Sequence, residues 1–145
     1  MTLVAQILQD KGRAIYSTTP DATVYQALEQ MAQYDVGALL VLDGKSLVGI
    51  LSERDYARKI ILKGKTSKET FVREIMTEDV VGVSPQQTIE QCMALMTAKR
   101  VRHLPVIDRG ELIGVISIGD VVKSLIADQQ FLIEELEKYV TGVGA

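Results

Sequence analysis

The feature that most constrains this chain is an internal repeat. At a constant offset of 65 residues, which separates Pro20 from Pro85, twelve residues of the segment 20–55 recur without a gap. Conservative pairs such as Val24 and Ile89 fill many of the positions between them. Most solenoid units are roughly 20–50 residues long, so this period indicates a duplicated half-domain rather than an array. The identical pairs are Pro20/Pro85, Thr23/Thr88, Gln26/Gln91, Met31/Met96, Val36/Val101, Leu39/Leu104, Val41/Val106, Asp43/Asp108, Leu47/Leu112, Gly49/Gly114, Ser52/Ser117 and Asp55/Asp120.

Each copy has the pattern of a β-α-β-β-α unit. A short stretch rich in β-branched residues leads in, over 15–18 and 80–83. A Pro-x-x-Thr motif then opens an amphipathic helix, with Thr23 or Thr88 as the expected N-cap. Two short apolar runs follow, joined by DGKS or DRGE, which predicts a hairpin. A second helix begins near the aspartate that closes each copy.

These patterns predict an α+β fold made of two β-α-β-β-α copies. One copy is too small to bury a stable core, so the two copies are expected to pack face to face about a pseudo-twofold axis. We assign residues 1–62 to the first copy, 63–70 to a polar linker, 71–127 to the second copy and 128–145 to a C-terminal helix and tail.

The tail carries a further helical pattern from about 128 to 140. Its apolar residues form one stripe, which Phe131 and Ile133 widen. A helix of this kind either caps the core or meets the same helix of a second chain, and the wide stripe favours the second. We therefore expect a homodimer. The stripe consists of Leu132, Leu136, Tyr139 and Val140.

Charge and composition limit the classes of partner. The net charge is −3, which argues against a nucleic-acid partner, because proteins that bind phosphate backbones usually carry a clustered basic face. The single cysteine, Cys92, has no partner for an internal disulfide. The N-terminus is unlike a signal peptide and no long apolar run is present, so a cytoplasmic protein without a membrane partner is expected.

Both copies end on the same motif, an apolar run closed by Ser-x-x-Asp. It reads VGILSERD in the first copy and IGVISIGD in the second. One interpretation is a helix-capping box, which needs no ligand. The other is a ligand clamp, because an aspartate accepts two hydrogen bonds from the vicinal hydroxyls of a ribose and a helix start favours a phosphate. The motif alone leaves both open.

The two copies together resemble the CBS domain, which is named after cystathionine β-synthase. The resemblance rests on the tandem spacing, on both Ser-x-x-Asp motifs and on RHLPVID at 102–108. It covers the chain from about residue 5 to 127. It implies a tandem CBS-domain pair that binds adenosine-containing ligands in clefts between the copies and pairs with a second such protein. The implied ligand is an adenine nucleotide such as AMP, ADP, ATP or NAD, and the resemblance favours the clamp interpretation.

The resemblance also implies which residues contact the ligand. Besides the serine and aspartate of each motif, it points to the start of the strand that precedes the motif. Basic groups are distributed differently between the copies. Arg54 stands beside the first aspartate, where the second copy has Gly119, and either clamps a phosphate or pairs with a neighbouring carboxylate. The motif and strand positions are Ser52, Arg54 and Asp55 with Val36, Gly37 and Ala38, and Ser117, Gly119 and Asp120 with Val101, Arg102 and His103.

In the family, each cleft also borrows the segment that leads into the first strand of the other copy. Met76 and Thr77 fit the usual pattern, in which a backbone group and a hydroxyl read the adenine. The equivalent segment, 9–12, has the sequence QDKG and departs from it. Lys11 and Gly12 are therefore candidates without an assigned role: Lys11 either contacts a phosphate or is an ordinary loop lysine. His103, the only histidine, either contacts ligand or is structural.

The expected function is a regulatory sensor, not an enzyme. The sequence has no P-loop, no nucleophile with a matching base and no cluster of metal ligands, so no cofactor or metal is required. The regulated target is expected to be a separate protein. The alternative is a structural dimerisation module whose clefts are unused.

Overall fold

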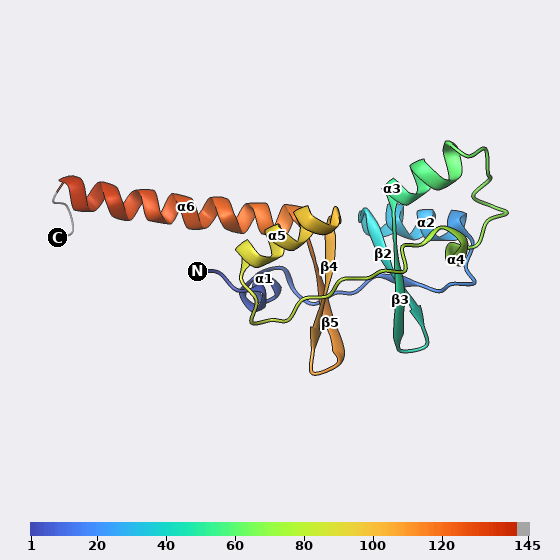
Figure 1. Cartoon of the computed structure of the whole chain (residues 1–145), viewed down its shortest axis with the longest axis horizontal. Coiled ribbons are helices and arrows are strands. Elements are labelled where there is room, and N and C mark those ends of the chain that lie inside the picture. The colour runs from blue at the N-terminus through green and yellow to red at the C-terminus, as the bar shows by residue number, and fades with distance from the viewer. Residues whose placement is uncertain (142–145) are drawn as a thin grey trace. The chain divides into compact units, whose positions relative to one another are not determined.

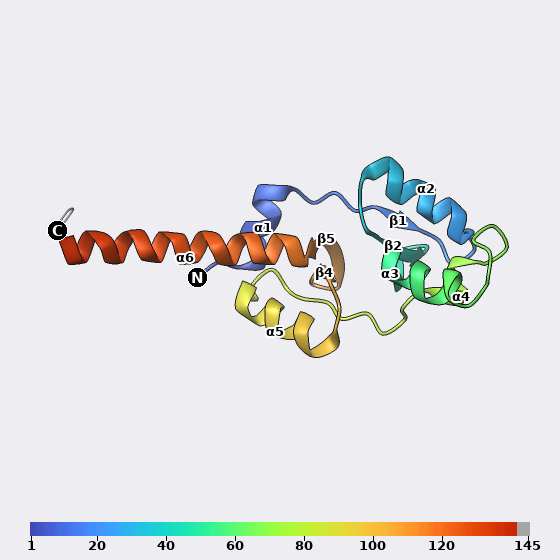
Figure 2. The ribbon, with the colours of Figure 1, turned by 90° about the horizontal axis from the view of Figure 1, so that it is seen from above.

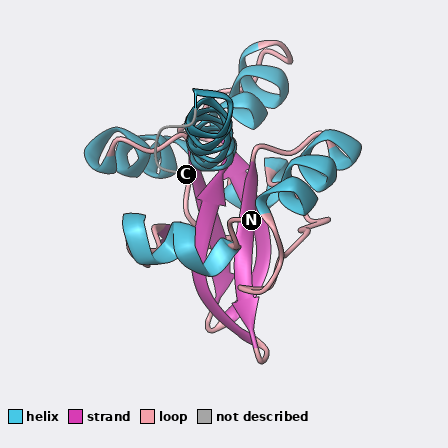
Figure 3. Ribbon diagram, turned by 90° about the vertical axis from the view of Figure 1, so that its left-hand side faces the viewer, coloured by secondary structure: helices cyan, strands magenta, loops and turns pink. Residues whose placement is uncertain are grey.

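The structure is a computed structural model in which residues 1–141 are described (Figure 1). It divides into two compact units. The first-copy unit consists of Ile15–Val81. The second-copy unit consists of Met1–Ala14 together with Gly82–Ala145. Both units mix helices and strands, which confirms the predicted α+β class (Figure 3).

The first-copy unit contains a three-stranded sheet of order β1-β2-β3. β1 runs parallel to β2, and β2 pairs antiparallel with β3 through the predicted DGKS turn. The elements are β1 (Ser17–Thr18), α2 (Val24–Tyr34), β2 (Ala38–Asp43), β3 (Ser46–Ser52), α3 (Glu53–Tyr56), the π-helical turn η1 (Ala57–Ile61) and α4 (Val72–Ile75).

The second-copy unit contains a two-stranded antiparallel sheet, closed by the predicted DRGE turn. α1 contacts β5 and α6, and α5 contacts β4 and α6, so the two shorter helices flank the start of α6 (Figure 2). The elements are α1 (Val4–Lys11), α5 (Ile89–Lys99), β4 (His103–Asp108), β5 (Glu111–Ser117) and α6 (Ile118–Thr141).

The leading strand predicted over 80–83 is reduced to one parallel bridge, between Val83 and Val106. The reason lies in β4. In the first copy, Leu40 N–H donates to the carbonyl of Tyr16 at 3.1 Å and extends the parallel pairing. The residue of the second copy that matches Leu40 is Pro105, which has no N–H, so this rung is missing.

Both predicted helix N-caps are confirmed. The backbone N–H of Gln26 donates to Thr23 Oγ1 at 3.1 Å, and Gln91 N–H donates to Thr88 Oγ1 at 3.1 Å. The threonine N–H groups donate in return to the side-chain oxygens of the glutamines, which completes a capping box in each copy. The repeated Thr-x-x-Gln therefore fixes where α2 and α5 begin.

The short helix α4 lies before the Pro-x-x-Thr motif of the second copy in sequence, but it packs in the first-copy unit. At the start of α4, Val72 N–H donates to the carbonyl of Ala22 at 2.8 Å, and Arg73 N–H donates to the carbonyl of Pro20 at 3.1 Å. The side chains of Val72 and Ile75 are buried in the apolar core of this unit. The repeated Pro-x-x-Thr segment thus serves as the acceptor for the first N–H groups of α4, which have no partner inside the helix.

The helix α1 lies before the Pro-x-x-Thr motif of the first copy in sequence, and it packs, in the same way, in the second-copy unit. At the start of α1, Val4 N–H donates to the carbonyl of Gln87 and Ala5 N–H donates to the carbonyl of Pro85, both at 2.9 Å. The side chains of Val4 and Leu8 are almost completely buried. Each unit is therefore completed by a helix that lies, in sequence, just before the repeated motifs of the other copy: α4 completes the first-copy unit and α1 completes the second-copy unit.

The glycine that recurs in both Ser-x-x-Asp motifs allows these helices and the residues after them to approach closely. A Cβ on Gly49 would lie 2.8 Å from Met76 Sδ and 3.0 Å from the carbonyl oxygen of Thr77. A Cβ on Gly114 would lie 2.7 Å from Leu8 Cδ2. The distances of 2.8 and 2.7 Å are shorter than real Cβ contacts, so a side chain at either position would force its neighbours to shift. Glycine therefore recurs where Met76 and Thr77 lie against β3 and where Leu8 of α1 lies against β5.

The predicted linker is not a detached loop. The carbonyl of Thr70 accepts the N–H of Val24 at 2.9 Å, and the carbonyl of Ser67 accepts the N–H of Tyr25 at 2.9 Å. The linker thereby satisfies the first N–H groups of α2. The exposed Lys68 lies over the ring of Tyr25, 4.9 Å from its centroid.

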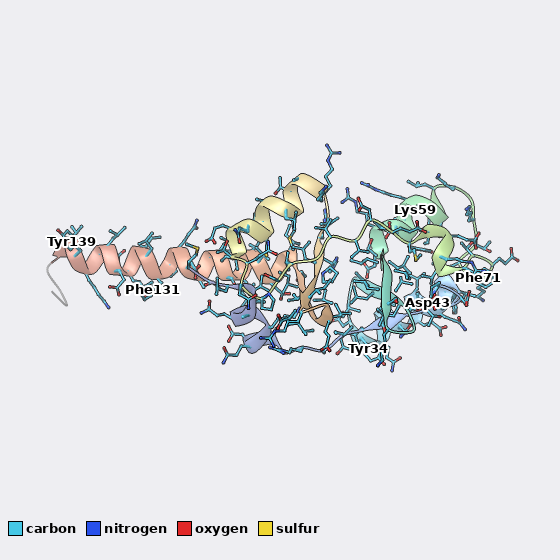
Figure 4. The ribbon with its side chains drawn as sticks, turned by 60° about the horizontal axis from the view of Figure 1, so that its bottom comes forward. Tyr34, Asp43, Lys59, Phe71, Phe131 and Tyr139 are labelled. Carbon is cyan, nitrogen blue, oxygen red and sulfur yellow. The ribbon has the colours of Figure 1, made fainter. Side chains whose placement is uncertain are left out.

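The predicted tail helix is the C-terminal part of one continuous helix. α6 runs for 24 residues from Ile118 to Thr141 without a break. Val121 is buried, whereas all residues of 129–140 are exposed, and this part of α6 extends beyond the other elements of its unit (Figures 1 and 4). None of the helices in the described chain is both long and apolar enough to cross a bilayer.

Replacing Gly49 with alanine is expected to lower the free energy of unfolding by about 1–3 kcal/mol, because the new methyl group overpacks the contact with the backbone after α4. Gly37→Ala is the matched control, since a Cβ there meets no atom within 4 Å. Urea unfolding of both variants measures the difference. Equal stability of the two variants would contradict the proposed role of this glycine.

Candidate functional site

In the first-copy unit, Ser52 and Asp55 form a reciprocal capping box at the junction of β3 and α3. Asp55 N–H donates to Ser52 Oγ at 3.2 Å. The N–H and hydroxyl of Ser52 donate to Asp55 Oδ2 at 3.0 and 3.1 Å. The predicted capping box is therefore confirmed for Ser52 and Asp55. It engages only one of the two carboxylate oxygens.

The other oxygen of Asp55, Oδ1, receives groups from two further segments. The hydroxyl of Thr77 donates to it at 3.2 Å. The ammonium of Lys59 lies 3.1 Å away and also donates to the carbonyl of Ile75 at 2.8 Å. The side chain of Asp55 is 13 % exposed. This carboxylate thus connects the end of β3, the helix that follows and the segment after α4.

The start of β2 borders the same junction. The carbonyl of Gly37 accepts the N–H of Glu53 at 3.0 Å, and Ala38 lies opposite Ser52 in the β2–β3 pair. Val36 packs against the core of this unit. The three strand-start residues predicted for the first copy therefore lie beside the Ser-x-x-Asp motif.

Arg54 and Met76 occupy contrasting positions. Arg54 is exposed and forms no ion pair with any residue of the described chain, so the expected alternative of a pairing with a neighbouring carboxylate is not realised. Met76 is half-buried and packs against the core of the first-copy unit. Met76 therefore contributes a half-buried apolar side chain, whereas the guanidinium of Arg54 is accessible to an anion from solvent.

The second-copy unit repeats the capping box at the junction of β5 and α6. Asp120 N–H donates to Ser117 Oγ at 3.2 Å, and Ser117 N–H donates to Asp120 Oδ2 at 2.8 Å. Lys11, at the end of α1, places its ammonium 2.7 Å from the same oxygen and donates to the carbonyl of Val115 at 3.0 Å. Within residues 1–141, no group donates a hydrogen bond to Asp120 Oδ1.

The Lys11 contact dominates the electrostatics of Asp120. Burial alone would raise the pKa of this carboxyl, but the hydrogen bond and charge of Lys11, together with the hydrogen bonds from Ser117, outweigh burial and hold the pKa below its ordinary value. Asp120 is therefore ionised at neutral pH. Lys11 is not an ordinary loop lysine, because its side chain is anchored at both the carboxylate and a strand carbonyl.

The strand start of the second copy also borders its motif. The carbonyl of Arg102 accepts the N–H of Ile118 at 2.8 Å, and His103 lies opposite Ser117 in the β4–β5 pair. Burial, followed by the charges of Lys11 and Arg102, lowers the pKa of His103 more than Asp120 raises it. His103 is therefore a neutral imidazole at neutral pH, with one donor and one acceptor nitrogen.

The remaining predicted residues of the second copy are backbone elements of the same region. Val101 N–H donates to the carbonyl of Met96 at 3.1 Å and closes the end of α5. Gly12 follows α1 with a φ of 92°, a conformation that favours glycine. Gly119 is exposed in the first turn of α6. None of the three presents a side-chain functional group.

The departure of QDKG from the family pattern has a structural consequence. In the first-copy unit, Thr77 and Ile50 exchange two backbone hydrogen bonds, of 2.9 and 3.0 Å, so that the segment after α4 joins the edge of β3. At the matching position in the second-copy unit, the carbonyl of Val115 accepts the side chain of Lys11 instead. The two units thus present different groups beside similar aspartates.

Sequence reasoning missed Lys59, which contacts Asp55 directly. The available signal was the spacing, since Lys59 follows Asp55 by four residues and such residues share a helix face. The η1 turn preserves this proximity. The second contact of Lys59, with the carbonyl of Ile75, depends on where α4 packs and has no signal in the local sequence.

No cluster of three or more metal-ligating side chains occurs in the part of the chain that the structure describes. A cavity of about 400 Å³ lies in the first-copy unit, but it contains none of the predicted site residues. It is lined by Tyr25, Tyr56, Ile60, Ile61 and residues 65–69.

Comparison with known proteins decides the family. The model of the CBS domain matches residues 11–62 and 72–127. The chain belongs to the CBS domain family. It is a tandem CBS pair, as the sequence predicted, followed by the extension of α6.

Relatives of this CBS pair occur in bacteria and plants. A solved protein with CBS domains from Burkholderia ambifaria is 57 % identical with a TM-score of 0.85, over 88 % of this chain and 96 % of that one. The mitochondrial CBS-domain protein CBSX3 of Arabidopsis thaliana is 40 % identical, over 97 % of this chain and 73 % of its own length. A CBS domain pair solved with 5′-methylthioadenosine and S-adenosyl-L-methionine shares the fold, with 21 % identity and a TM-score of 0.75 over 86 % of this chain and 99 % of that one.

The Lys11–Asp120 pair is expected to stabilise the fold in a pH-dependent manner. Because folding lowers the pKa of Asp120, its contribution is present above the ordinary carboxyl value of 3.8 and is lost as the pH falls through the lower folded pKa. Lys11→Met should therefore be less stable than the wild type at pH 7, and the difference should shrink below about pH 3.8. Urea unfolding across this range, with the exposed Lys45→Met as control, measures it. A difference that does not change with pH would contradict the assignment.

Proposed function

We propose that this CBS pair is a regulatory module that binds an adenosine-containing ligand at the Ser-x-x-Asp junction of each unit. The observation that supports this most directly is that the two oxygens of each carboxylate differ in their partners. One oxygen of Asp55 and of Asp120 maintains the capping box, while the second oxygen is directed at other groups or has no partner in the described chain. A carboxylate positioned in this way is suited to accept the hydroxyls of a ribose.

The surrounding groups support a ligand that also carries phosphate. Arg54 is exposed and has no ion pair among the described residues, so its planar guanidinium is available to bind a phosphate with two hydrogen bonds. In the second-copy unit, Lys11 bonds Asp120, and the charges of Lys11, Asp120 and Arg102 all act on His103. AMP, ADP, ATP and NAD fit this chemistry. A CBS pair of the same fold has been solved with two adenosyl compounds, which supports the class of ligand.

The proposed role is regulation of a separate protein rather than catalysis. Ligand binding shifts such a partner only if the ligand prefers one of two conformations of the module. The described residues hold no metal cluster, and the net charge of −3 does not favour nucleic acid as the partner. A soluble compartment such as the cytoplasm is the proposed location.

Replacing Asp55 or Asp120 with asparagine is expected to weaken binding of AMP at the altered site by about tenfold or more, because the charged acceptor for the ribose hydroxyls is lost. The asparagine oxygen still accepts the serine N–H, so the capping box and the fold should survive. Calorimetric titration with AMP measures the change.

The repeat supplies matched controls for these variants. Asp43 and Asp108 are an identical pair at the hairpin ends, and Figure 4 labels Asp43. Asp43→Asn and Asp108→Asn should leave AMP binding unchanged. If all four variants bind AMP as the wild type does, the carboxylates serve only as helix caps and the ligand proposal fails.

A second proposal concerns α6, whose exposed part carries a seven-residue repeat. Five apolar residues and one glutamine follow one another along the sequence at alternating steps of three and four residues. Beside them runs a second line of apolar residues, each seven residues from the next. This period favours a left-handed pair of helices. The first line is Val122, Leu125, Gln129, Leu132, Leu136 and Tyr139, and the second is Ile126, Ile133 and Val140.

We infer that a second copy of this chain covers this stripe. The stripe is largely uncovered within the described chain: Leu132 is 58 % exposed, Leu136 54 % and Tyr139 85 %, and Figure 4 shows Tyr139 projecting from α6. Two identical stripes are self-complementary when related by a twofold axis. A single polar residue in such a line, here Gln129, fixes the register of a helix pair. Dimerisation without ligand binding is the competing function.

Changing Leu132 and Leu136 together to glutamine is expected to raise the dimer dissociation constant by at least about a hundredfold, because each chain loses two buried leucines. Glutamine keeps a similar helix propensity. Phe131→Gln is the control, since Phe131 is 65 % exposed and, although it widens the apolar face, belongs to neither of these two lines. Sedimentation velocity distinguishes the species. A double variant that remains as dimeric as the control would overturn this interface.

A further inference from the structure

Both carboxylate oxygens of Asp55 are engaged by groups of the first-copy unit, through three hydrogen bonds and one ion pair. A carboxylate offers about four lone-pair directions, two on each oxygen. Oδ2 accepts the N–H and hydroxyl of Ser52. Oδ1 accepts the hydroxyl of Thr77 at 3.2 Å, and the ammonium of Lys59 lies 3.1 Å from the same oxygen in an ion pair. A ribose hydroxyl therefore reaches Asp55 only by displacing one of these donors.

The hydrogen bonds that join Asp120 to Ser117 N–H and to Lys11 both end on one carboxylate oxygen. Oδ2 accepts the N–H of Ser117 at 2.8 Å and the ammonium of Lys11 at 2.7 Å. Oδ1 receives no hydrogen bond from the part of the chain that the structure describes. The side chain of Asp120 is 23 % exposed, compared with 13 % for Asp55. A hydroxyl is thus able to bind Asp120 without breaking an existing ion pair.

The difference arises from two lysines that break the repeat. Lys59 follows Asp55 by four residues, and the matching residue after Asp120 is Ser124. Lys11 matches Met76 at the repeat offset, so it approaches from the opposite segment and bonds the capping oxygen. Each unit therefore has one lysine beside its motif, but only Lys59 covers the oxygen that the capping box leaves free.

We propose that Lys59 masks the first-copy site, so that the two sites bind a ribose diol with unequal affinity and the Asp120 site fills first. This inference rests on the proposed function, since it concerns the same two aspartates. The ion pair of Lys59 is anchored a second time at the carbonyl of Ile75, which keeps the ammonium in place over Asp55 Oδ1. In this pair both groups carry a charge, so the ammonium adds a Coulomb attraction that an uncharged ribose hydroxyl does not supply to the same carboxylate.

The test uses adenosine, which carries the diol but no phosphate that binds lysine directly. The amide signals of Ser52 and Ser117 in nitrogen-15 NMR spectra report each site separately, because both N–H groups bond the aspartate concerned. In the wild type, the Ser117 amide should titrate at a concentration at least about tenfold lower than the Ser52 amide, the equivalent of one charge-assisted hydrogen bond. With 2′-deoxyadenosine, which has lost one hydroxyl of the diol, both responses should weaken.

Two reciprocal variants exchange the residues of the repeat. Lys59→Ser should bring the Ser52 midpoint to within about threefold of the Ser117 midpoint, whereas Ser124→Lys should move the Ser117 midpoint upward by about tenfold. Lys63→Ser is the control, because Lys63 is an exposed lysine of the same unit. Circular dichroism of every variant verifies that it is folded.

The outcomes separate this inference from the function on which it rests. If both amides of the wild type titrate at one concentration, or if folded Lys59→Ser leaves the Ser52 midpoint unchanged, the mask is wrong although the sites bind adenosine. If adenosine and AMP perturb neither amide in any variant, the proposed ligand class itself is wrong and the mask falls with it.

Discussion

The structure depends on one constraint: neither copy of the repeat completes its own unit. Each copy ends its leading strand on a Pro-x-x-Thr turn, and the carbonyls of that turn accept the first N–H groups of a helix from elsewhere in the chain. The N–H groups at the start of α4 donate to the carbonyls of Pro20 and Ala22. Those at the start of α1 donate to the carbonyls of Pro85 and Gln87. The apolar side chains of these helices then fill the core, which removes more apolar surface from water than one copy buries alone.

This packing also determines the chemistry beside each aspartate. The segment after α4 brings Thr77 to Asp55, and the end of α1 brings Lys11 to Asp120. Because α1 and α4 are not copies of each other in sequence, two similar capping boxes acquire different neighbours. The duplication thus preserves the scaffold, while the two added helices distinguish the sites.

Capping and ligand binding, which the sequence presents as alternatives, are compatible in this geometry. A carboxylate has two oxygens, and the box with Ser52 or Ser117 requires only one of them. The box orders the aspartate at the helix start and fixes the direction of its second oxygen. A side chain held in this way loses little further conformational entropy when it binds a ligand, so the cap contributes to preorganisation of the site.

The sequence by itself determined the duplication, the Thr23 and Thr88 caps, the hairpin turns and the helix starts after Ser52 and Ser117, because periodicity, turn residues and caps act over a few residues. It also contained the reason for the rung that is missing at Pro105, since proline has no N–H. Only the tertiary structure decided that Lys59 meets both Asp55 and Ile75, and that Lys11 is anchored on Asp120 rather than free in solvent. The family resemblance implied that lead-in segments are exchanged, but the residues alone did not, because contacts between distant segments depend on how apolar surfaces pack and not on any local pattern.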